Sequence, residues 1–270
     1  TYCRMHRSRF ASACRRTFDE KAYVSIIIER TAIVNRFGSI FPKSVESAEN
    51  HDSNRKNLGK RAKDMKGYRI SLIRHGRTEA NDKGIYIGRT DYPLSQKGIS
   101  ELYNKLDEFE YPHVGKVYSS PLQRCTETAE ILFPDSSVQI VENLIEMDFG
   151  DFEGKSADEL VKKPEFLEWL KGGADSRPPK GESLQEVQLR LFKALRTIIL
   201  DMMQNDILHT AVVTHAGIIT NLIAGFGLPK IDPKELRPAP GEGYDILVTA
   251  SLWQRSGAFE ILGMTPYANN

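Results

Sequence analysis

The stretch from Tyr68 to Thr78 reads YRISLIRHGRT and joins a short apolar run to a group of charged and imidazole side chains. The apolar run over residues 68–73 predicts a buried strand. Arg74, His75 and Gly76 would then lie directly beyond the carboxyl end of that strand. Ligands of open α/β sheets bind at this position. The stretch therefore predicts both a strand of a sheet and part of a binding site.

After this stretch the chain alternates between short apolar runs and helical patterns. Strands are predicted at residues 116–119, 138–141, 211–214, 244–250 and 258–262. Helices are predicted at residues 95–109, 121–132, 157–170, 183–203 and 217–226, with Ser95 as the N-cap of the first. Strands that alternate with helices indicate an α/β architecture, in which helices cover both faces of a mostly parallel sheet.

The composition is that of a chain with a buried core. The 270 residues are 40% hydrophobic and 27% charged, which excludes the disordered and fibrous classes. No apolar stretch reaches the roughly 18 residues that a membrane-spanning helix needs. The three cysteines, Cys3, Cys14 and Cys125, form no CxxC pair, which argues against a disulfide framework and against a cysteine zinc site. We therefore expect a cytoplasmic protein without a membrane partner.

Residues 1–64 differ in charge from the remainder. They carry 14 Lys and Arg against 7 Asp and Glu, which leaves 23 against 29 for residues 65–270. This step predicts a basic N-terminal extension, disordered or loosely attached, followed by one domain over residues 65–270. A targeting segment, a nucleic-acid-binding arm and a misassigned start upstream of Met65 remain alternatives for the extension. The negative charge of residues 65–270 opposes nucleic-acid binding by the domain.

Polar side chains of a few chemical types follow four of the predicted strands. They lie in the loops or at the helix starts after residues 73, 119, 141 and 214. The carboxyl ends of parallel strands meet at one edge of a sheet, so these side chains should converge there. The candidate residues are Arg74, His75, Arg124, Glu146, His215 and Gly217.

These residue types suit a phosphoryl ligand. Arg74 and Arg124 would neutralise and orient the phosphoryl group, because a guanidinium matches phosphate oxygens with a fork of donors. A neutral His75 would attack phosphorus and form a phosphohistidine. His215 would donate to a non-bridging oxygen, and the helix that Gly217 opens favours an anion at its start. Glu146 would protonate the leaving oxygen and later activate water.

Each of these residues also has a structural interpretation. A single histidine at a strand end is more often a hydrogen-bonded structural residue than a catalyst, and an arginine in a helix is most often a surface charge. Three strand ends each supply a cationic or imidazole group of the kind that binds phosphate, and this favours the functional interpretation. The sequence contains no HExxH, GxxxxGK[ST] or GxGxxG motif and no zinc spacing, so no metal and no cofactor are predicted.

The same residues belong to a larger set of motifs that resembles the histidine phosphatase superfamily, which includes the phosphoglycerate mutases. Five blocks occur in the family's order within residues 68–226. They are LIRHGRTEAN at 72–81, IGRTD with LSQKG at 87–98, SSPLQRCTETA at 119–129, EMDFGDFEG at 146–154 with GES at 181–183, and VTHAG at 213–217. The resemblance implies a phosphoglycerate mutase-like three-layer α/β/α sandwich that requires no metal.

The resemblance also implies a role for each matched residue. His75 would be the phosphorylated nucleophile and Glu146 the proton donor, while Arg74, Arg124 and His215 would hold the phosphoryl group. Asn81 matches a position that commonly helps to bind phosphate in the family. These roles agree with those assigned above from chemistry alone, and the expected ligand is a small-molecule phosphomonoester.

The length of one connection separates phosphatases from mutases in this family. The cofactor-dependent mutases carry a sizeable insertion after the glutamate block that closes the site, whereas only 35 residues lie between Glu146 and Glu182 here. Access of water to a phosphohistidine favours hydrolysis. The blocks and the short connection are most similar to the α-ribazole phosphatases of cobalamin synthesis. A broad sugar or glycerate phosphate phosphatase, a mutase-like enzyme and an inactive phosphate-binding module remain alternatives, and the sequence does not determine the oligomeric state.

Overall fold

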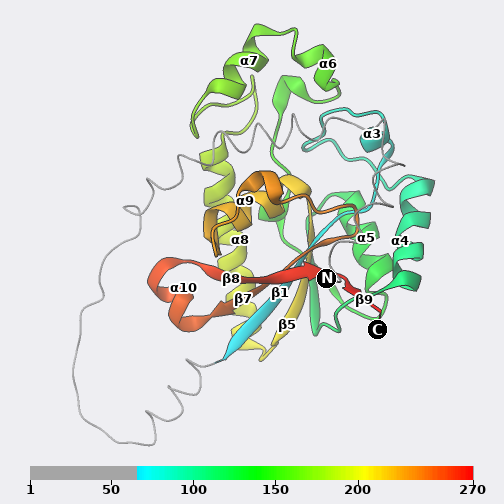
Figure 1. Ribbon diagram of the computed structural model, residues 1–270, viewed down its shortest axis with the longest axis vertical. Coiled ribbons are helices and arrows are strands. Elements are labelled where there is room, and N and C mark those ends of the chain that lie inside the picture. Colours follow the sequence, from blue (N-terminus) through cyan, green and yellow to red (C-terminus); the bar gives the residue numbers. More distant parts are fainter. Residues whose placement is uncertain (1–65, 270) are drawn as a thin grey trace, which may run out of the picture.

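The computed structural model describes residues 66–269 and shows a central sheet between two layers of helices (Figure 1). The predicted extension at residues 1–64 and the alternatives for it lie outside the described residues. Among the residues described, no helix is both long enough and apolar enough to span a membrane.

The central sheet has seven strands in the order β4-β3-β5-β1-β7-β8-β6. Strands β1, β3, β4 and β5 pair in parallel, and β7 runs antiparallel between β1 and β8. The mostly parallel sheet that the sequence predicted is therefore confirmed. The strands are β1 (Gly67–Arg74), β3 (Lys116–Ser119), β4 (Val138–Ile140), β5 (His209–Thr214), β6 (Gly227–Leu228), β7 (Gly243–Thr249) and β8 (Phe259–Thr265).

Helices pack on both faces of this sheet. Alternate residues of β1 point to opposite faces, so Ile70 and Leu72 belong to one apolar cluster and Ile73 belongs to the other. The first cluster lies under α8 (Leu184–Gln204) and α9 (Ala216–Phe226), and the second lies under α4 (Gln96–Glu108) and α5 (Gln123–Leu132). The three-layer α/β/α arrangement is thus confirmed.

Local capping explains where two of these helices begin. The Ser95 side chain accepts a hydrogen bond from the Gly98 N–H, as expected of the N-cap of α4. Ser183 caps α8 in a capping box with Glu186, whose carboxylate accepts from the Ser183 N–H. Ser95 is the N-cap that the sequence pattern predicted, and Ser183 is the first residue of the helix predicted over residues 183–203.

The structure differs from several of the predicted elements. The single helix expected at 157–170 is two short helices, α6 (Ala157–Leu160) and α7 (Pro164–Lys171), because a proline disfavours helical conformation in the residue before it. Helix α5 begins at Gln123, two residues after the predicted start. A short helix, α10 (Ala250–Ser256), follows β7 where the strand was expected to continue to Ala250.

Short elements that the sequence analysis missed complete the fold. Helix α3 (Glu79–Asp82) follows β1, and β2 (Phe109–Glu110) pairs with β9 (Tyr267–Ala268) in a separate two-stranded sheet. Three 3₁₀ turns lie at Glu142–Leu144, Gly150–Phe152 and Pro233–Glu235. The first of these turns, η2, lies directly before Glu146 in the sequence.

Candidate active site

Four of the predicted site residues come together beyond the ends of the parallel strands. His75 follows β1, His215 follows the neighbouring strand β5, and Arg124 lies in α5, which follows β3. The imidazole rings of His75 and His215 have their centroids 5.2 Å apart. The exposed fractions of His75, Arg124, Glu146 and His215 are 6%, 2%, 5% and 0%. Ionisable groups so deeply buried need specific partners.

His75 is held in one tautomer by its own loop. Its Nδ1 lies 2.6 Å from the Gly76 carbonyl oxygen, which can only accept, so Nδ1 carries the proton. In the neutral ring Nε2 then has a lone pair available. Burial lowers the pKa of His75 well below its usual value, and the positive charges of Arg124 and Arg74 lower it further. The ring is therefore neutral near pH 7, which is the state a nucleophile requires.

His215 and Arg124 are joined in one hydrogen-bonded unit. The Arg124 Nε–H donates to His215 Nδ1 at 3.3 Å, which places the His215 proton on Nε2, 2.8 Å from Ser120 Oγ. Burial and the charge of Arg124 lower the pKa of His215 well below its usual value. A phosphate oxygen that accepts from His215 Nε2 would replace or share the contact with Ser120.

The guanidinium of Arg124 is oriented by main-chain carbonyls. Its Nη1 donates to the Thr90 carbonyl at 3.0 Å and its Nη2 to the Gly88 carbonyl at 2.8 Å. A Cβ atom at Gly88 would lie 2.1 Å from the Met147 carbonyl oxygen, so only glycine permits this approach of the two loops. Together with the bond to His215, these contacts use three of the five N–H groups of Arg124, which leaves two for an anionic ligand.

Glu146 lies in the loop after η2. Its Oε1 accepts from the Met147 N–H at 2.8 Å, and its carboxyl also hydrogen-bonds the main-chain N–H of Gly217. Burial raises the pKa of Glu146 above its usual value, against the opposing effect of the Met147 bond and of the charges of Arg124 and Arg190. A raised pKa suits a carboxyl group that must donate a proton.

The other predicted residues, Arg74, Gly217 and Asn81, have different roles in the fold. Arg74 ends β1, and its Nη1 donates to the Pro238 carbonyl at 2.9 Å. Gly217 is buried in the first turn of α9. The Asn81 side-chain oxygen accepts from Thr78 N and Thr78 Oγ1, so it closes the capping box of α3. Its proposed phosphate contact therefore depends on its amide NH2 group alone.

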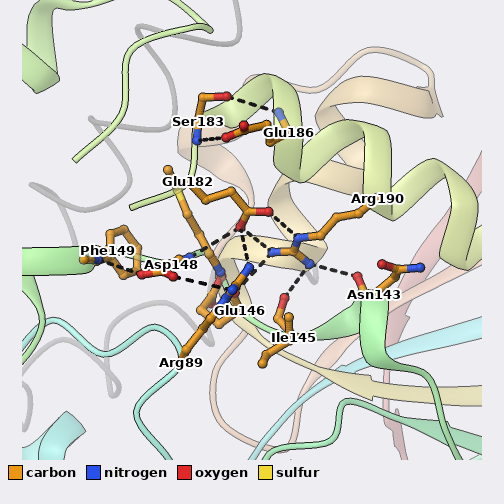
Figure 2. A network of polar contacts seen from close by, with 12 residues as sticks. Arg89, Asn143, Ile145, Glu146, Asp148, Phe149, Glu182, Ser183, Glu186 and Arg190 are labelled. Atoms are coloured by element: carbon orange, nitrogen blue, oxygen red, sulfur yellow. Dashed lines mark hydrogen bonds and ion pairs between the residues drawn. The ribbon is translucent and has the colours of Figure 1, made fainter. Parts of the chain in front are cut away.

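Sequence reasoning missed a buried ionic network beside Glu146, which Figure 2 shows. Arg190 reaches from α8 to the loop of Glu146 and pairs with Glu182 at 2.8 Å. In the sequence, Glu182 stands out only as part of the GES block at 181–183. Arg190 shows no functional pattern beyond its place beside the apolar positions Val187 and Leu191 of α8. Ser120 has no signal in the sequence beyond its place in the block at residues 119–129.

The connection between Glu146 and Glu182 is short, as predicted, but it is folded. Helices α6 and α7 lie at the same end of the molecule as α3 (Figure 1). Phe166 and Trp169 of α7 pack against Phe149 and Phe152, which follow Glu146 in the sequence. A pocket of about 380 Å³ beside α7 contains none of the predicted site residues and is lined by Glu165, Glu168, Trp169, Ser176, Arg177, Pro178, Pro179 and Lys180.

Within residues 66–269 no group of three or more His, Cys, Asp or Glu side chains is arranged to hold a metal ion. The thiol of Cys125 is buried beside His215, with Sγ 3.6 Å from Nε2. Burial raises the pKa of this thiol to about 12, so Cys125 is a protonated packing residue near pH 7.

Comparison with known proteins identifies a family that this chain resembles. The family model described as "Histidine phosphatase superfamily (branch 1)" matches residues 70–246. A protein of Hydrogenobacter thermophilus named "Putative phosphoserine phosphatase 2" is 32% identical over 60% of this chain and 82% of its own length. The adenosylcobalamin/alpha-ribazole phosphatase of Escherichia coli is 31% identical over 60% of this chain and 80% of its own length.

A solved structure shows the same fold. The alpha-ribazole phosphatase of Shigella flexneri superposes with a TM-score of 0.62 at 24% identity, over 75% of this chain and 98% of that one. At this identity the match supports the fold alone. The predicted three-layer architecture therefore has a counterpart among experimentally determined structures.

Proposed function

This chain belongs to the histidine phosphatase superfamily (branch 1), and we propose that it is a metal-independent phosphomonoesterase that acts through a phosphohistidine on His75. One observation carries the proposal. A neutral His75 with its Nδ1 proton bound to the Gly76 carbonyl lies within one buried cluster with His215, Arg124 and Glu146. That cluster combines a nucleophile, a cationic arginine and a neutral imidazole donor for a phosphate, and an acid with a raised pKa.

In the first step, Nε2 of His75 attacks phosphorus as the bond from phosphorus to the alcohol oxygen breaks. Glu146 transfers its proton to that oxygen, so the alcohol leaves neutral and Glu146 becomes a carboxylate. Arg74 and Arg124 balance the charge of the transferring group, and His215 donates to one of its oxygens. The Gly76 carbonyl stabilises the phosphorylated ring because it accepts a hydrogen bond from the Nδ1–H throughout.

In the second step, water attacks phosphorus and the Nε2–phosphorus bond breaks. The Glu146 carboxylate takes the proton of the water, so Glu146 regains its acid form and His75 regains its lone pair. Inorganic phosphate is released. The cycle consumes one water and one phosphomonoester and needs no further reactant.

The short connection after Glu146 favours hydrolysis over transfer to a second substrate. Two helices of four and eight residues, α6 and α7, occupy the place where a mutase needs a larger closing segment. A phosphohistidine that is not sealed from water will be hydrolysed. We therefore propose a phosphatase activity and not a mutase activity.

For the substrate we propose α-ribazole 5′-phosphate or the corresponding cobamide phosphate, which places the enzyme in cobalamin synthesis. The similarity to the Escherichia coli adenosylcobalamin/alpha-ribazole phosphatase supports this choice. The relative named as a phosphoserine phosphatase, at 32% identity, supports phosphoserine as a second candidate.

The test is phosphate release by the purified protein in the presence of a metal chelator. Equal concentrations of α-ribazole 5′-phosphate, phosphoserine, 3-phosphoglycerate and p-nitrophenyl phosphate are compared by kcat/KM. A preference for α-ribazole 5′-phosphate of about two orders of magnitude would support the cobalamin assignment. Comparable slow rates on all four would retain the chemistry and reject the substrate, and no release from any of them would reject the phosphatase proposal.

A further inference from the structure

Arg190 is a largely buried arginine in the second turn of α8, and all five of its N–H groups have partners. Its Nε–H and one N–H of Nη2 donate hydrogen bonds to the two carboxylate oxygens of Glu182, at 2.8 and 3.0 Å. Its three remaining hydrogen bonds reach main-chain carbonyls of a single segment, residues 143–146. The side chains of Arg190 and Glu182 are 12% and 10% exposed. A guanidinium with every donor engaged has one orientation.

The three carbonyls belong to η2 and to the loop after it, which carries Glu146. Arg190 Nη1 donates to the Asn143 and Ile145 carbonyls at 2.8 and 2.6 Å, and Nη2 donates to the carbonyl of Glu146 itself at 3.1 Å (Figure 2). Glu182 Oε2 also accepts from the Asp148 N–H at 3.4 Å. The pair therefore holds the backbone on both sides of Glu146.

A buried ion pair of this kind is a weak source of stability, because the cost of removing two charges from water offsets much of their attraction. Here the ion pair between Arg190 and Glu182 fixes the geometry of a loop that has no regular secondary structure between η2 and Gly150. Glu146 lies on that loop, and its carboxyl hydrogen-bonds the main-chain N–H of Gly217.

We propose that Arg190, held in place by Glu182, is a positioning residue that sets the Glu146 carboxyl for proton transfer to the leaving oxygen. This inference rests on the proposed phosphatase function. Arg190 does not touch the reacting atoms; it acts through the backbone of Glu146. In the step concerned, Glu146 gives its proton to the alcohol oxygen while the Nε2–phosphorus bond forms and the phosphorus–oxygen bond breaks.

The positive charge of Arg190 also affects the pKa values of two site residues. It lowers the pKa of Glu146 against the larger effect of burial, and it contributes to the low pKa of His215. The guanidinium is therefore near enough to Glu146 and His215 for a substitution of Arg190 to alter their electrostatic environment.

The experiment compares two substrates that differ in their need for an acid. An alkyl ester such as glycerol 2-phosphate requires protonation of its leaving oxygen, whereas p-nitrophenolate leaves without a proton. The value of kcat/KM covers the steps up to loss of the alcohol, so it excludes the later attack of water, in which Glu146 also acts. The variants are Arg190→Met and Arg190→Lys, and the control is Arg196→Met, which changes an exposed arginine of the same helix.

For Arg190→Met we expect kcat/KM on glycerol 2-phosphate to fall by about 10- to 100-fold, and kcat/KM on p-nitrophenyl phosphate to fall less than about threefold. Arg190→Lys should resemble Arg190→Met, because an ammonium cannot reproduce five donors in one plane. Arg196→Met should match the wild type on both substrates. Equal losses on both substrates, or no loss, would overturn the positioning role while leaving the phosphatase proposal in place.

Glu182→Gln provides a second variant if Arg190→Met does not fold. It keeps the shape of the side chain and weakens its hold on Arg190, so the same selective loss should appear at a smaller size, about three- to tenfold on the alkyl ester. A loss that does not distinguish the two substrates would again reject the inference. A wild-type protein that releases phosphate from neither substrate would reject the proposed function and this inference together.

Discussion

His75 carries the most specific prediction at the scale of single residues. Because its Nε2 is the proposed nucleophile, His75→Ala should lower phosphatase kcat/KM by at least about 10⁴-fold while the far-UV circular dichroism stays unchanged. The control is His113→Ala, which removes an exposed histidine and should retain full activity. A His75→Ala protein that turns over at the wild-type rate would reject the phosphohistidine mechanism.

Glu146 makes a prediction about pH. Burial raises its pKa, so its acid form persists to higher pH than that of an ordinary carboxyl, and it is lost as the pH rises through the raised value. For an alkyl phosphate, the kcat/KM of the wild type should therefore decline on the alkaline side of its optimum. Glu146→Gln should lower that rate by about 10²- to 10⁴-fold and remove this decline.

The p-nitrophenyl ester serves as the internal control for the Glu146 prediction. Its kcat/KM should fall far less in Glu146→Gln, because its alcohol leaves as an anion. An alkaline decline that persists unchanged in Glu146→Gln would assign that titration to another group. It would also remove the main reason for naming Glu146 as the acid.

At the scale of elements, the start of α8 can be tested on its own. Ser183 accepts from the Glu186 N–H, and the Glu186 carboxylate accepts from the Ser183 N–H, so the box satisfies two donors that the helix leaves open. Ser183→Ala should lower the free energy of unfolding by about 1 kcal/mol, measured by urea titration. Thr197→Ala, an exposed change in the same helix, should stay within about 0.5 kcal/mol of the wild type.

The elements also show how far a local pattern predicts structure. Helix α4 begins where its predicted serine cap indicated, because capping depends on residues within one turn, and α8 begins one residue after the predicted start, Ser183. The pattern at 157–170 suggested one helix, and the structure breaks it before Pro164. The aromatic residues of α7 pack against Phe149 and Phe152. This is a tertiary contact, and the hydrophobic periodicity of the segment does not predict it.

At the scale of the whole molecule, buried histidines make the fold sensitive to acid. His75 and His215 have pKa values well below those of exposed histidines, so the unfolded state binds protons in a range where the native state does not. Stability is therefore lost as the pH falls below the unfolded value near 6.5. The free energy of unfolding should therefore fall between roughly pH 7.5 and roughly pH 5.5, with His209 adding to the loss and the raised pKa of Glu146 opposing it.

The matched variant for this whole-molecule effect is His215→Asn. It removes the more deeply buried of these two imidazoles and should reduce the loss, whereas the exposed change Thr197→Ala should leave it unchanged. Denaturant titrations at the two pH values measure both. An identical pH dependence in His215→Asn and the wild type would show that His215 is not protonated differently in the two states.

The sequence alone determined the fold class, the family and the candidate residues of the site. Each rests on local information: apolar runs of strand or helix length, caps at helix starts, and polar residues placed directly after a strand. Since parallel strands end at one edge, the approach of His75, Arg124, Glu146 and His215 followed from their positions after β1, β3, β4 and β5.

Only the tertiary structure decided the network that holds those residues. Arg190 lies 44 positions from Glu146 in the chain and contacts it through main-chain carbonyls, which carry no side-chain signal. The tautomer of His215 depends on Arg124 and Ser120, and the low pKa of both site histidines depends on how completely the fold covers them. Burial and hydrogen-bond partners are properties of the packed chain, because they arise from residues that are distant in sequence and meet only when the layers assemble.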